Sequence, residues 1–530
     1  MKENSKKNLI IFSYILIWFL VNLSFLTYFP FFHSDETWLA GLTKGMMEKG
    51  HLDLTEPFFD LFPRAAHGLK LLFHGFQAPF LKVFGFSGLG IRCLSLTAGA
   101  FSLYLFFRLL FRTGFSFFLS FTGMVLLSAD IQFIYASHFG RQEILLFSFM
   151  LAGFNSFYSD WRHRGIITGL ITGLAAGVHP NAFLIAWPVS ILFLFEIIRG
   201  RRSKREGGGF LIAAGTSSLV FVIASFVINQ NFISEYARFG ASVGVRSGMV
   251  ERISDFMPFL VKLFSRVSGT YYTPDIRIQM ILLPVLIVVG CILLFLHHRN
   301  GVQTEDGTGL HSLITGLLVG LTGILGVTIG IIIIGKYSQP SIIFYFPFFY
   351  ILLISILSKA FRYMPWLVFI CPFFLIIISG FQLQHEILRE GDSFQEYNQA
   401  LKAIIPPGSR VIGNINAGVA FSDMDYLDWR NFPLLGDYGL SVEDYLNDRK
   451  IEYLVYPDEL DYIYNSRPVW NIMYGNLYPW YEELQSFINR RCRLSGAFSS
   501  PGYAMRIVPL RFSKEWGVRV YEVLSPSISE

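Results

Sequence analysis

The sequence predicts a polytopic α-helical membrane protein with about eleven transmembrane helices, followed by a small α/β domain. Three observations lead to this fold class. Of the 530 residues, 53% are hydrophobic and only 15% are charged, against roughly 25% charged residues in an ordinary soluble domain. Several apolar runs reach about 20 residues, the length that crosses a bilayer as a helix. After Gln382, charged and turn-forming residues become common and no further run of this length occurs.

Apolar runs place the spans within residues 1–381. The first run follows Lys2, Lys6 and Lys7. We interpret it as a retained helix, because it is too long for a signal-peptide core and no small-x-small cleavage site follows it. The expected spans lie near residues 9–29, 90–110, 115–135, 143–160, 165–179, 181–198, 210–228, 279–296, 312–334, 340–358 and 364–381.

The positions of Lys and Arg predict the orientation of these spans, because cytoplasmic loops carry the basic excess. With a cytoplasmic N-terminus, that side holds Arg108, Arg112, Arg162, Arg164, Arg199, Arg201, Arg202, Lys204, Arg205, Arg299, Lys359 and Arg362. The opposite side then holds residues 31–89, 136–142, 229–278 and 335–339, together with the C-terminal domain, residues 382–530. We therefore expect the C-terminal domain outside the cytoplasm.

Glycines at regular spacing predict close packing between helices. Gly165, Gly169, Gly173 and Gly177 recur every four residues and line one helix face. Small residues on one face let a second helix approach closely. A later helix carries Gly316, Gly320, Gly323 and Gly326 in a similar pattern.

Two loops on the non-cytoplasmic side are too long to be simple connections. Loop 31–89 contains two segments with apolar residues at helical spacing, 37–50 and 67–84, which predict amphipathic helices at the membrane surface. Loop 229–278 mixes arginines with aromatic residues. Long loops of this kind are often lids or binding loops.

The C-terminal domain is predicted to be a small α/β unit with a partly parallel sheet, because strand and helix patterns alternate along it. Residues 410–417 and 451–456 have strand patterns, and 442–449 has a helical one. Residues 503–510 and 517–524 are predicted to be a closing strand pair. About 150 residues are enough for an independently folding domain.

Asp35 and Glu36 are the most informative residues for function. They follow the first span directly, where charged carboxylates are costly unless they are solvated or paired. One interpretation is a helix cap, with Asp35 as the N-cap of a helix that starts at Glu36. The other is an active site, because the acidic pair lies beside a loop long enough to enclose a substrate.

Three further loops bring polar groups to the same predicted face. The first contains His138, Arg141 and Glu143, which could be a phosphate site or a structural ion pair. His179 ends the fifth predicted span, and Lys336 and Tyr337 follow a very apolar one. Lys336 is a candidate phosphate contact, with simple snorkelling as the alternative. No Walker motif, HExxH or phosphate-binding glycine loop occurs, and the cytoplasmic loops are too short for a catalytic domain.

Several of these segments resemble the GT-C superfamily of integral membrane glycosyltransferases. The resemblance is closest to the protein mannosyltransferase, aminoarabinose transferase and bacterial RgtA/B/C/D-like branches, and it covers roughly residues 9–381. The resembling segments are His33-Ser34-Asp35-Glu36 with Trp38, Gly140-Arg141-Gln142-Glu143, residues 173–180, and residues 336–347.

The resemblance implies a catalytic membrane domain of residues 1–381 in a bacterial inner membrane, with a periplasmic C-terminal domain. The donor would be a sugar on a polyprenyl phosphate, and the acceptor a glycan, lipid or protein; a nucleic-acid partner is not expected. Asp35 would be the general base or orient the acceptor hydroxyl, and transfer would invert the anomeric centre.

The remaining roles implied by the resemblance are assisting ones. Glu143 would match the second acidic position, and Glu36 would assist Asp35. The donor phosphate would be bound by Arg141, Lys336 or an arginine of loop 229–278 such as Arg246, with His138, His179 and Tyr337 also contacting substrate. No cofactor is certain, although a divalent metal at Glu36 and His179 stays open.

This chain departs from the family pattern at two places. Glu143 stands where several relatives carry Asp, and the C-terminal domain does not look like the MIR-type insert of eukaryotic protein mannosyltransferases, which argues against protein O-mannosylation. The domain either binds acceptor, for which the Asp-, Tyr- and Trp-rich residues 422–440 are suited, or is a structural lid.

The main alternative is a transporter or flippase of lipid-linked sugars. That class predicts internal repeats and charged residues in the middle of helices, and the sequence indicates neither. A second alternative is an O-antigen ligase or polymerase, which joins glycans but belongs to another family.

Overall fold

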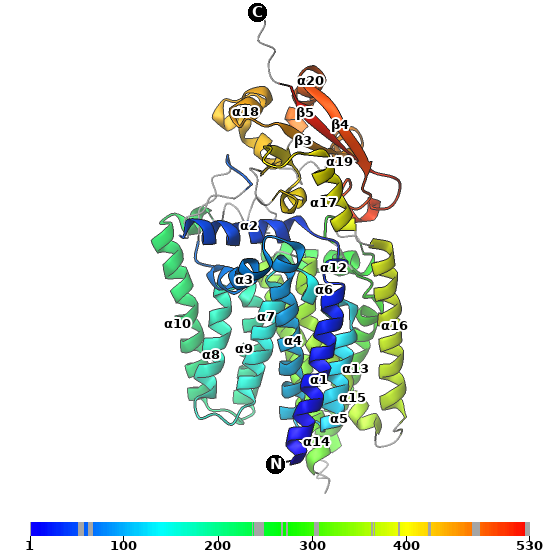
Figure 1. The fold of residues 1–530 in the computed structure, drawn as a ribbon. Helices are drawn as coiled ribbons and strands as arrows, with labels where there is room; N and C mark the ends of the chain where they lie inside the picture. Colours follow the sequence, from blue (N-terminus) through cyan, green and yellow to red (C-terminus); the bar gives the residue numbers. More distant parts are fainter. Residues whose placement is uncertain are drawn as a thin grey trace, which may run out of the picture.

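The computed structural model describes residues 2–50, 58–61, 67–235, 237, 248–266, 269–271, 274–300, 307–335, 337–361, 364, 366–390, 393–421, 426–468 and 478–524. A long bundle of helices carries a soluble domain on one end, and the chain starts at the other end of the bundle (Figure 1). The prediction of a helical membrane protein with a C-terminal α/β domain is confirmed.

The bundle contains a helix at each of the eleven predicted positions. Eight described helices are long and apolar enough to cross a membrane, and a ninth span results if the bent pair α5–α6 counts as one. The shorter apolar helices Glu143–Phe157 and Arg164–Gly177 lie at the other two positions. The bundle helices are α1 (Lys2–Ser24), α4 (Gly88–Arg112), α5 (Phe117–Ala129), α6 (Ile131–His138), α7 (Glu143–Phe157), α8 (Arg164–Leu174), α9 (Phe183–Ile198), α10 (Lys204–Ile228), α13 (Arg277–Asn300), α14 (Gly307–Ile334), α15 (Phe346–Phe361) and α16 (Leu367–Glu390).

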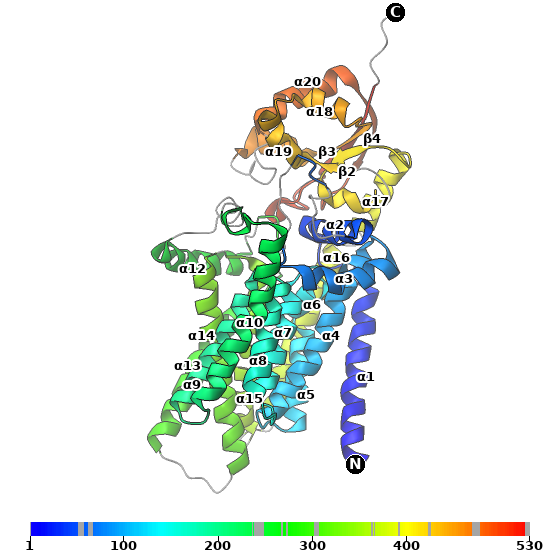
Figure 2. The same ribbon diagram turned by 90° about the vertical axis from the view of Figure 1, so that its left-hand side faces the viewer.

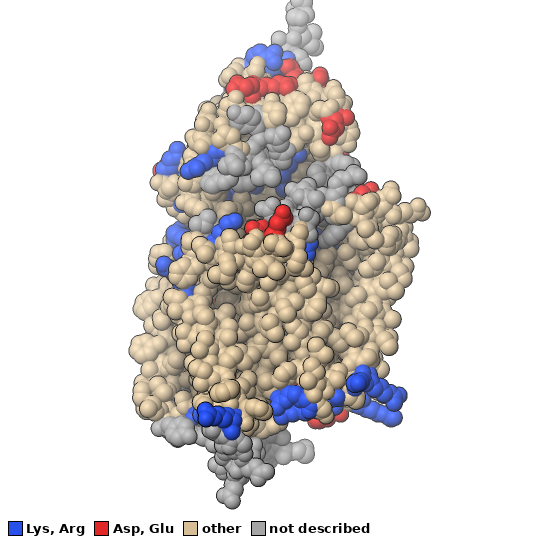
Figure 3. All heavy atoms as spheres, turned by 180° about the vertical axis from the view of Figure 1, so that it is seen from behind, with Lys and Arg blue, Asp and Glu red and all other residues tan. Residues whose placement is uncertain are grey.

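The surface of the bundle fits a protein that spans a membrane several times. A broad belt without Lys, Arg, Asp or Glu surrounds the middle of the face drawn in Figure 3, and basic side chains gather at its lower end. This is the end where the chain starts in Figure 1. Basic side chains of the described residues thus gather at the end where the topology predicts them, whereas the assignment of that end to the cytoplasm stays a prediction.

The sequence indicated no charged residue in the middle of a span, but Asp130, within the predicted span 115–135, lies buried inside the bundle at the junction of α5 and α6. The two helices bend there by 64°. Extended backbone at Asp130 (φ −69°, ψ 130°) ends α5, and its Oδ1 accepts a hydrogen bond from the Gln132 amide at 2.8 Å. Its Oδ2 accepts from Gln279 Nε2 at 2.9 Å and from the Tyr350 hydroxyl at 2.6 Å. Both carboxyl oxygens are thus hydrogen-bonded, and they link the α5–α6 junction to α13 and α15.

Three helices lie across the end of the bundle that faces the soluble domain: α2 (Ser34–Lys49), α3 (Leu71–Phe84) and α12 (Met249–Phe264) (Figures 1 and 2). The first two confirm the amphipathic helices predicted in loop 31–89. The third lies within the long loop 229–278.

The glycine face of α8 packs against α10, as predicted. A Cβ atom on Gly169 would lie 2.3 Å from the Phe210 carbonyl oxygen, and one on Gly173 would lie 2.3 Å from that of Ala214. Similarly close approaches occur on α14, where a Cβ on Gly326 would lie 2.4 Å from Pro188 Cα of α9. These glycines therefore let the helix backbones nearly touch.

The C-terminal domain is built on a mixed sheet of five strands in the order β2-β1-β3-β5-β4. β1 runs parallel to β2 and β3, and β5 runs antiparallel to β3 and β4. The partly parallel sheet is thus confirmed. Its strands are β1 (Val411–Gly413), β2 (Tyr426–Asp428), β3 (Tyr453–Pro457), β4 (Cys492–Ser499) and β5 (Gly517–Val523). Its helices are α17 (Ser393–Ile404), α18 (Val442–Asp448), α19 (Asp458–Ser466) and α20 (Tyr481–Arg491).

Two strand predictions in this domain are wrong. The strand expected at 410–417 ends at Gly413, and Ile415–Val419 forms a 3-10 helix whose first amide donates to Asp428 Oδ2 at 2.8 Å. Residues 503–510 are not the partner of β5, which pairs with β4 instead. Their amides have other acceptors: that of Arg506 donates to Glu459 Oε1 and that of Val508 to the Gly269 carbonyl.

The soluble domain and the first loop share one hydrophobic core. Phe31, Phe32 and Phe58 are buried in the same cluster as Trp429 and Tyr503 of the domain. The boundary expected at 381/382 falls inside α16, which continues to Glu390. The domain therefore packs against the end of the bundle that carries the first loop.

We predict that Gly169→Ala lowers the stability of the bundle, whereas Gly215→Ala does not. A methyl group at 169 meets the Phe210 carbonyl, and one at 215 meets no atom within 4 Å. Overpacking of this kind costs about 1–3 kcal/mol, whereas alanine in open space favours a helix by about 1 kcal/mol. Thermal unfolding in detergent measures the difference, and equal melting temperatures would contradict the close packing.

Candidate active site

Asp35 is placed by the first turn of α2, which projects it from the membrane-surface end of the bundle. The N-cap is His33, whose Nδ1 accepts a hydrogen bond from the Asp35 amide at 3.1 Å. The side chain of Glu36 accepts from the His33 amide at 2.8 Å and completes a capping box. The interpretation of Asp35 as the N-cap is therefore wrong, and its carboxyl group is left for other contacts.

Glu36 forms a fully buried ion pair with Arg92 of α4. Arg92 Nε donates to Glu36 Oε2 and Nη2 donates to Oε1, both at 2.8 Å, and both side chains have no solvent exposure. The Gly140 amide donates to Oε2 at 2.7 Å, and Arg92 Nη1 donates to the Leu26 carbonyl at 2.9 Å. Glu36 thus ties α2 to α4 and to the loop between α6 and α7.

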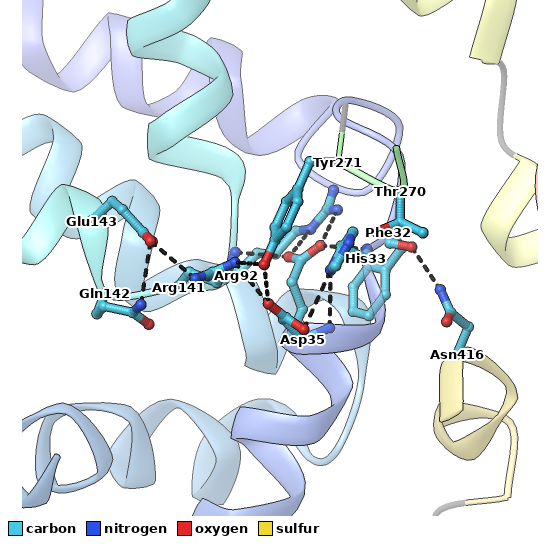
Figure 4. A network of polar contacts seen from close by, with 12 residues as sticks. Phe32, His33, Asp35, Arg92, Arg141, Gln142, Glu143, Thr270, Tyr271 and Asn416 are labelled. Atoms are coloured by element: carbon cyan, nitrogen blue, oxygen red, sulfur yellow. Dashed lines mark hydrogen bonds and ion pairs between the residues drawn. The ribbon is translucent and has the colours of Figure 1, made fainter. Parts of the chain in front are cut away.

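Asp35 points into a compact network with Arg141 and Tyr271 (Figure 4). Its Oδ2 accepts hydrogen bonds from Arg141 Nη1 at 2.7 Å and from the Tyr271 hydroxyl at 2.6 Å. Arg141 Nη1 also donates to the Tyr271 oxygen at 2.6 Å. The ring of His33 stacks on Tyr271, with centroids 4.4 Å apart and planes 9° apart. Three chain segments thus meet at one carboxylate.

Arg141 is shared with a second carboxylate. Its Nη2 lies 3.1 Å from Glu143 Oε1, which also accepts from Gln142 Nε2 at 3.2 Å. Among the described residues, Glu143 Oε2 and Arg141 Nε are buried without a hydrogen-bond partner. The side chain of Asp35 is 32% exposed, against 4% for Glu143 and 0% for Glu36. Asp35 is therefore the most exposed of the three carboxylates.

A buried cation lies close to this network. Lys70, which precedes α3, places its Nζ 4.6 Å from the ring centroid of Trp38, one turn along α2 from Asp35. Its charge acts on the Glu143 carboxyl. Arg141 and Lys70 thus give this end of the bundle two positive charges for an anionic ligand.

Two groups of the site have strongly shifted titration. Burial by itself raises the pKa of Asp35, but the charge of Arg141 and the Tyr271 hydroxyl outweigh it and hold that pKa well below its usual value. The pKa of His33 is lowered to about 3: burial is the largest cause, Arg141, Arg511 and Arg506 act in the same direction, and Asp35 opposes them. At neutral pH, Asp35 is therefore ionised and His33 is neutral.

The other sequence-predicted residues lie around the network or outside it. His138 is buried inside the bundle, where Nδ1 lies 2.7 Å from the Phe29 carbonyl oxygen and Nε2 3.0 Å from Asn22 Oδ1. His179 Nδ1 accepts from the Asn181 amide at 3.0 Å and caps a short helix. The Tyr337 hydroxyl donates to the Arg252 carbonyl and ties α12 to the bundle. Lys336 and Arg246 lie outside the described residues.

Glu36 and His179 do not fit a divalent metal as they are arranged. Both oxygens of Glu36 are taken by Arg92, Gly140 and His33. The lone pair on His179 Nδ1 is taken by its helix cap. Within the described parts of the chain, no group of three His, Cys, Asp or Glu gathers at metal-binding distance.

Sequence reasoning missed Arg92, Tyr271 and Lys70 as parts of the site. Arg92 had a usable signal, since a charged residue at the start of an apolar helix needs a partner. Lys70 lies within the predicted amphipathic segment 67–84 and Tyr271 within the predicted binding loop 229–278. No local pattern distinguishes these two from the other cations and aromatics of their loops.

No protein-family model matches the chain, and no curated protein matches it. Among solved structures, it is similar to ArnT from Cupriavidus metallidurans bound to undecaprenyl phosphate. The identity is 14%, the match covers 84% of this chain and 95% of that chain, and the TM-score is 0.43. It is also similar to the oligosaccharyltransferase of Archaeoglobus fulgidus in its apo form, with 11% identity, coverage of 89% and 72%, and a TM-score of 0.46. At these identities and TM-scores, the function has to be argued from the chain's own residues.

We predict that Glu36→Gln strongly destabilises the protein, because it leaves the Arg92 cation buried without a counter-charge. Breaking a buried ion pair from one side costs about 3–5 kcal/mol. Glu48→Gln, on the exposed end of the same helix, is the matched control and should cost about 0–1 kcal/mol. Thermal unfolding in detergent compares the two variants. A Glu36→Gln protein as stable as the control would show that the pair does not anchor α2.

We also predict that His33 contributes to the free energy of unfolding and that this contribution is lost in acid. Because its folded-state pKa is about 3 and its ordinary value 6.5, the unfolded chain binds more protons between these values. Its contribution is therefore complete above pH 6.5 and is lost as pH falls, by about 2–3 kcal/mol between pH 7 and 4.5.

In His33→Asn, which keeps a capping side chain, the melting temperature should fall less over this pH range than in the wild type. His163→Asn, at an exposed loop position, should follow the wild-type curve. Parallel curves for all three proteins would contradict a neutral, buried His33.

Proposed function

We propose that the protein is an integral membrane glycosyltransferase of the GT-C type, which its motifs resemble. It would transfer a hexose or pentose from a polyprenyl-phosphate donor to a glycan, lipid or protein acceptor on the side of the C-terminal domain. The observation that carries this proposal is the pairing of the accessible carboxylate of Asp35 with the cation of Arg141, 2.7 Å apart. A base and an anion-binding group thus lie side by side where the bundle ends.

Asp35 is proposed as the group that orients the acceptor hydroxyl and takes up its proton. The hydroxyl oxygen would attack the anomeric carbon as the bond from that carbon to the phosphate oxygen breaks. The electron pair of that bond leaves with the polyprenyl phosphate, and the proton passes to Asp35. Attack from the face opposite the leaving group inverts the anomeric centre.

Arg141 is proposed to stabilise the leaving phosphate, together with Lys70. In the ligand-free arrangement, Arg141 neutralises Asp35 and keeps its pKa low, which makes Asp35 a weak base. A donor phosphate that engages Arg141 would weaken this pairing and raise the basicity of Asp35. Donor binding would thereby activate the base only when there is a sugar to transfer.

The roles of the two other carboxylates differ under this proposal. Glu143 holds the guanidinium of Arg141 from the side away from Asp35. Glu36 acts on neither substrate: it fixes the backbone at His33 and Gly140, and so sets the positions of Asp35 and Arg141. The segment that ends at Tyr271 belongs to loop 229–278, the proposed cover of the donor.

The flippase alternative has less support. Asp130, the buried acid within the bundle, has both oxygens paired with Gln132, Gln279 and Tyr350, so it offers no free site to a passing substrate. The alternative of an O-antigen ligase or polymerase does not explain the pairing of Asp35 with Arg141.

We predict that Asp35→Asn lowers sugar transfer by about 10²–10⁴-fold, because it removes the proton acceptor without changing the side-chain shape. Glu143→Gln should lower it less, through weaker orientation of Arg141. The assay presents the purified protein in detergent with a panel of polyprenyl-phosphate sugars and follows release of polyprenyl phosphate and labelled product.

Glu48→Gln, distant from the network on α2, should keep wild-type activity. A folded Asp35→Asn protein that matches the wild type would refute the role of Asp35. Translocation of a lipid-linked sugar across vesicles without transfer would favour the flippase.

A further inference from the structure

We propose that Arg511 of the C-terminal domain is a positioning residue of the candidate site. It fixes the positions of the two segments that carry Asp35 and Tyr271. This inference rests on the proposed function, and it gives the soluble domain a direct part in assembling the site. The two segments are residues 31–35, which lead into α2, and residues 269–271 of the long loop.

The first segment is held at Phe31. The Arg511 guanidinium carbon lies 3.4 Å from the centroid of its ring, and the ring of Tyr503 stacks on it with centroids 4.0 Å apart. A Cβ on Gly502 would lie 2.5 Å from Phe31 Cε2. The aromatic ring is therefore enclosed by the C-terminal domain, with a cation against it.

The C-terminal domain also contacts Phe32, the residue before the N-cap His33. Its amide donates to the Tyr503 hydroxyl at 3.2 Å, and its carbonyl accepts from Asn416 Nδ2 at 2.8 Å. Figure 4 shows this carbonyl and Asn416 facing one another beside the network. The backbone that delivers Asp35 is thus fixed by the soluble domain immediately before the helix begins.

The second segment is held by the same strip of the domain. Arg511 Nη2 donates to the Thr270 carbonyl at 3.5 Å, and the Val508 amide donates to the Gly269 carbonyl at 2.8 Å. Thr270 precedes Tyr271, whose hydroxyl contacts Asp35 and Arg141. The side chain of Arg511 therefore contacts both segments directly.

The chemistry of these contacts requires an arginine. The guanidinium is planar, so it lies against the Phe31 ring while its Nη2 reaches the carbonyls of Thr270 and Arg506, the latter at 3.2 Å. Lysine offers a cation to the ring but not a rigid fork of donors. The side chain of Arg511 is buried, so its loss leaves space that lets both segments shift.

Such a shift acts on turnover more than on donor binding. A displacement of about 1 Å at a reacting group can cost about 10²-fold in rate. Arg141, the proposed phosphate ligand, contacts Asp35 and Tyr271 through Nη1, but it belongs to the α6–α7 loop, outside both segments, and Glu143 also holds its Nη2. The donor KM should therefore change little when Arg511 is replaced.

The experiment compares Arg511→Ala, Arg511→Lys and Arg493→Ala in the full-length protein. Arg493 is an exposed arginine of the same domain, paired with Glu522, and serves as the control. We expect kcat to fall at least about tenfold in Arg511→Ala with the donor KM within about threefold, an intermediate value in Arg511→Lys, and wild-type values in Arg493→Ala.

A double-mutant cycle with Tyr271→Phe tests whether Arg511 acts on the site through Tyr271. If Arg511 acts through Tyr271 and Asp35, the combined loss is smaller than the product of the two single losses, and both single variants shift the acidic limb of the kcat profile in the same direction. Multiplicative losses, or an Arg511→Ala kcat equal to that of Arg493→Ala, would overturn the proposal.

Hydrogen exchange provides a readout that does not depend on activity. Arg511→Ala should raise amide exchange in residues 31–37 and 269–271, whereas the core strand β3 should stay protected as in the wild type. Unchanged exchange there also overturns the proposal. If the wild type transfers no sugar from any donor but these segments loosen, the proposed function fails while the positioning contact holds.

Discussion

The buried ion pair between Glu36 and Arg92 is the constraint on which the site depends. A carboxylate and a guanidinium without solvent exposure are stable only when all their hydrogen-bonding positions are filled. Here further hydrogen bonds come from the backbone of three segments that converge at the pair: His33 before α2, Gly140 before α7, and Leu26 after α1. The pair therefore helps to set the separation between Asp35 and Arg141, although it contacts neither of these side chains.

Adjacent carboxylates have opposite fates because helix geometry turns them to different sides. Glu36 points into the bundle and is fully paired with Arg92, whereas Asp35 points toward the loop side and keeps part of its surface exposed. A single carboxylate at this place could not both anchor the helix in a buried ion pair and remain exposed. The acidic pair in the sequence thus separates the two tasks.

The soluble domain contacts the segments that build the candidate site. It shares a hydrophobic core with the first loop, and its residues 503–511 contact both the segment before α2 and the segment before Tyr271. This arrangement places an ionised aspartate, two cations and an aromatic ring where the apolar belt of the bundle ends. Under the proposed function, a donor from the bilayer and an acceptor from the aqueous side would meet at this level.

The sequence by itself determined the membrane class, the positions of the helices, the glycine face of α8 and the convergence of Asp35, Arg141 and Glu143 at one end. These follow from hydropathy, residue spacing and loop charge, which are local along the chain. Tertiary structure alone decided that Glu36 is an anchor, that His138 bridges Asn22 and Phe29, and that Asp130 breaks a span. It also decided that β4 pairs with β5 and that Tyr271 reaches Asp35. Each of these depends on which distant group satisfies a buried polar atom, and no spacing within one segment encodes the identity of its partner.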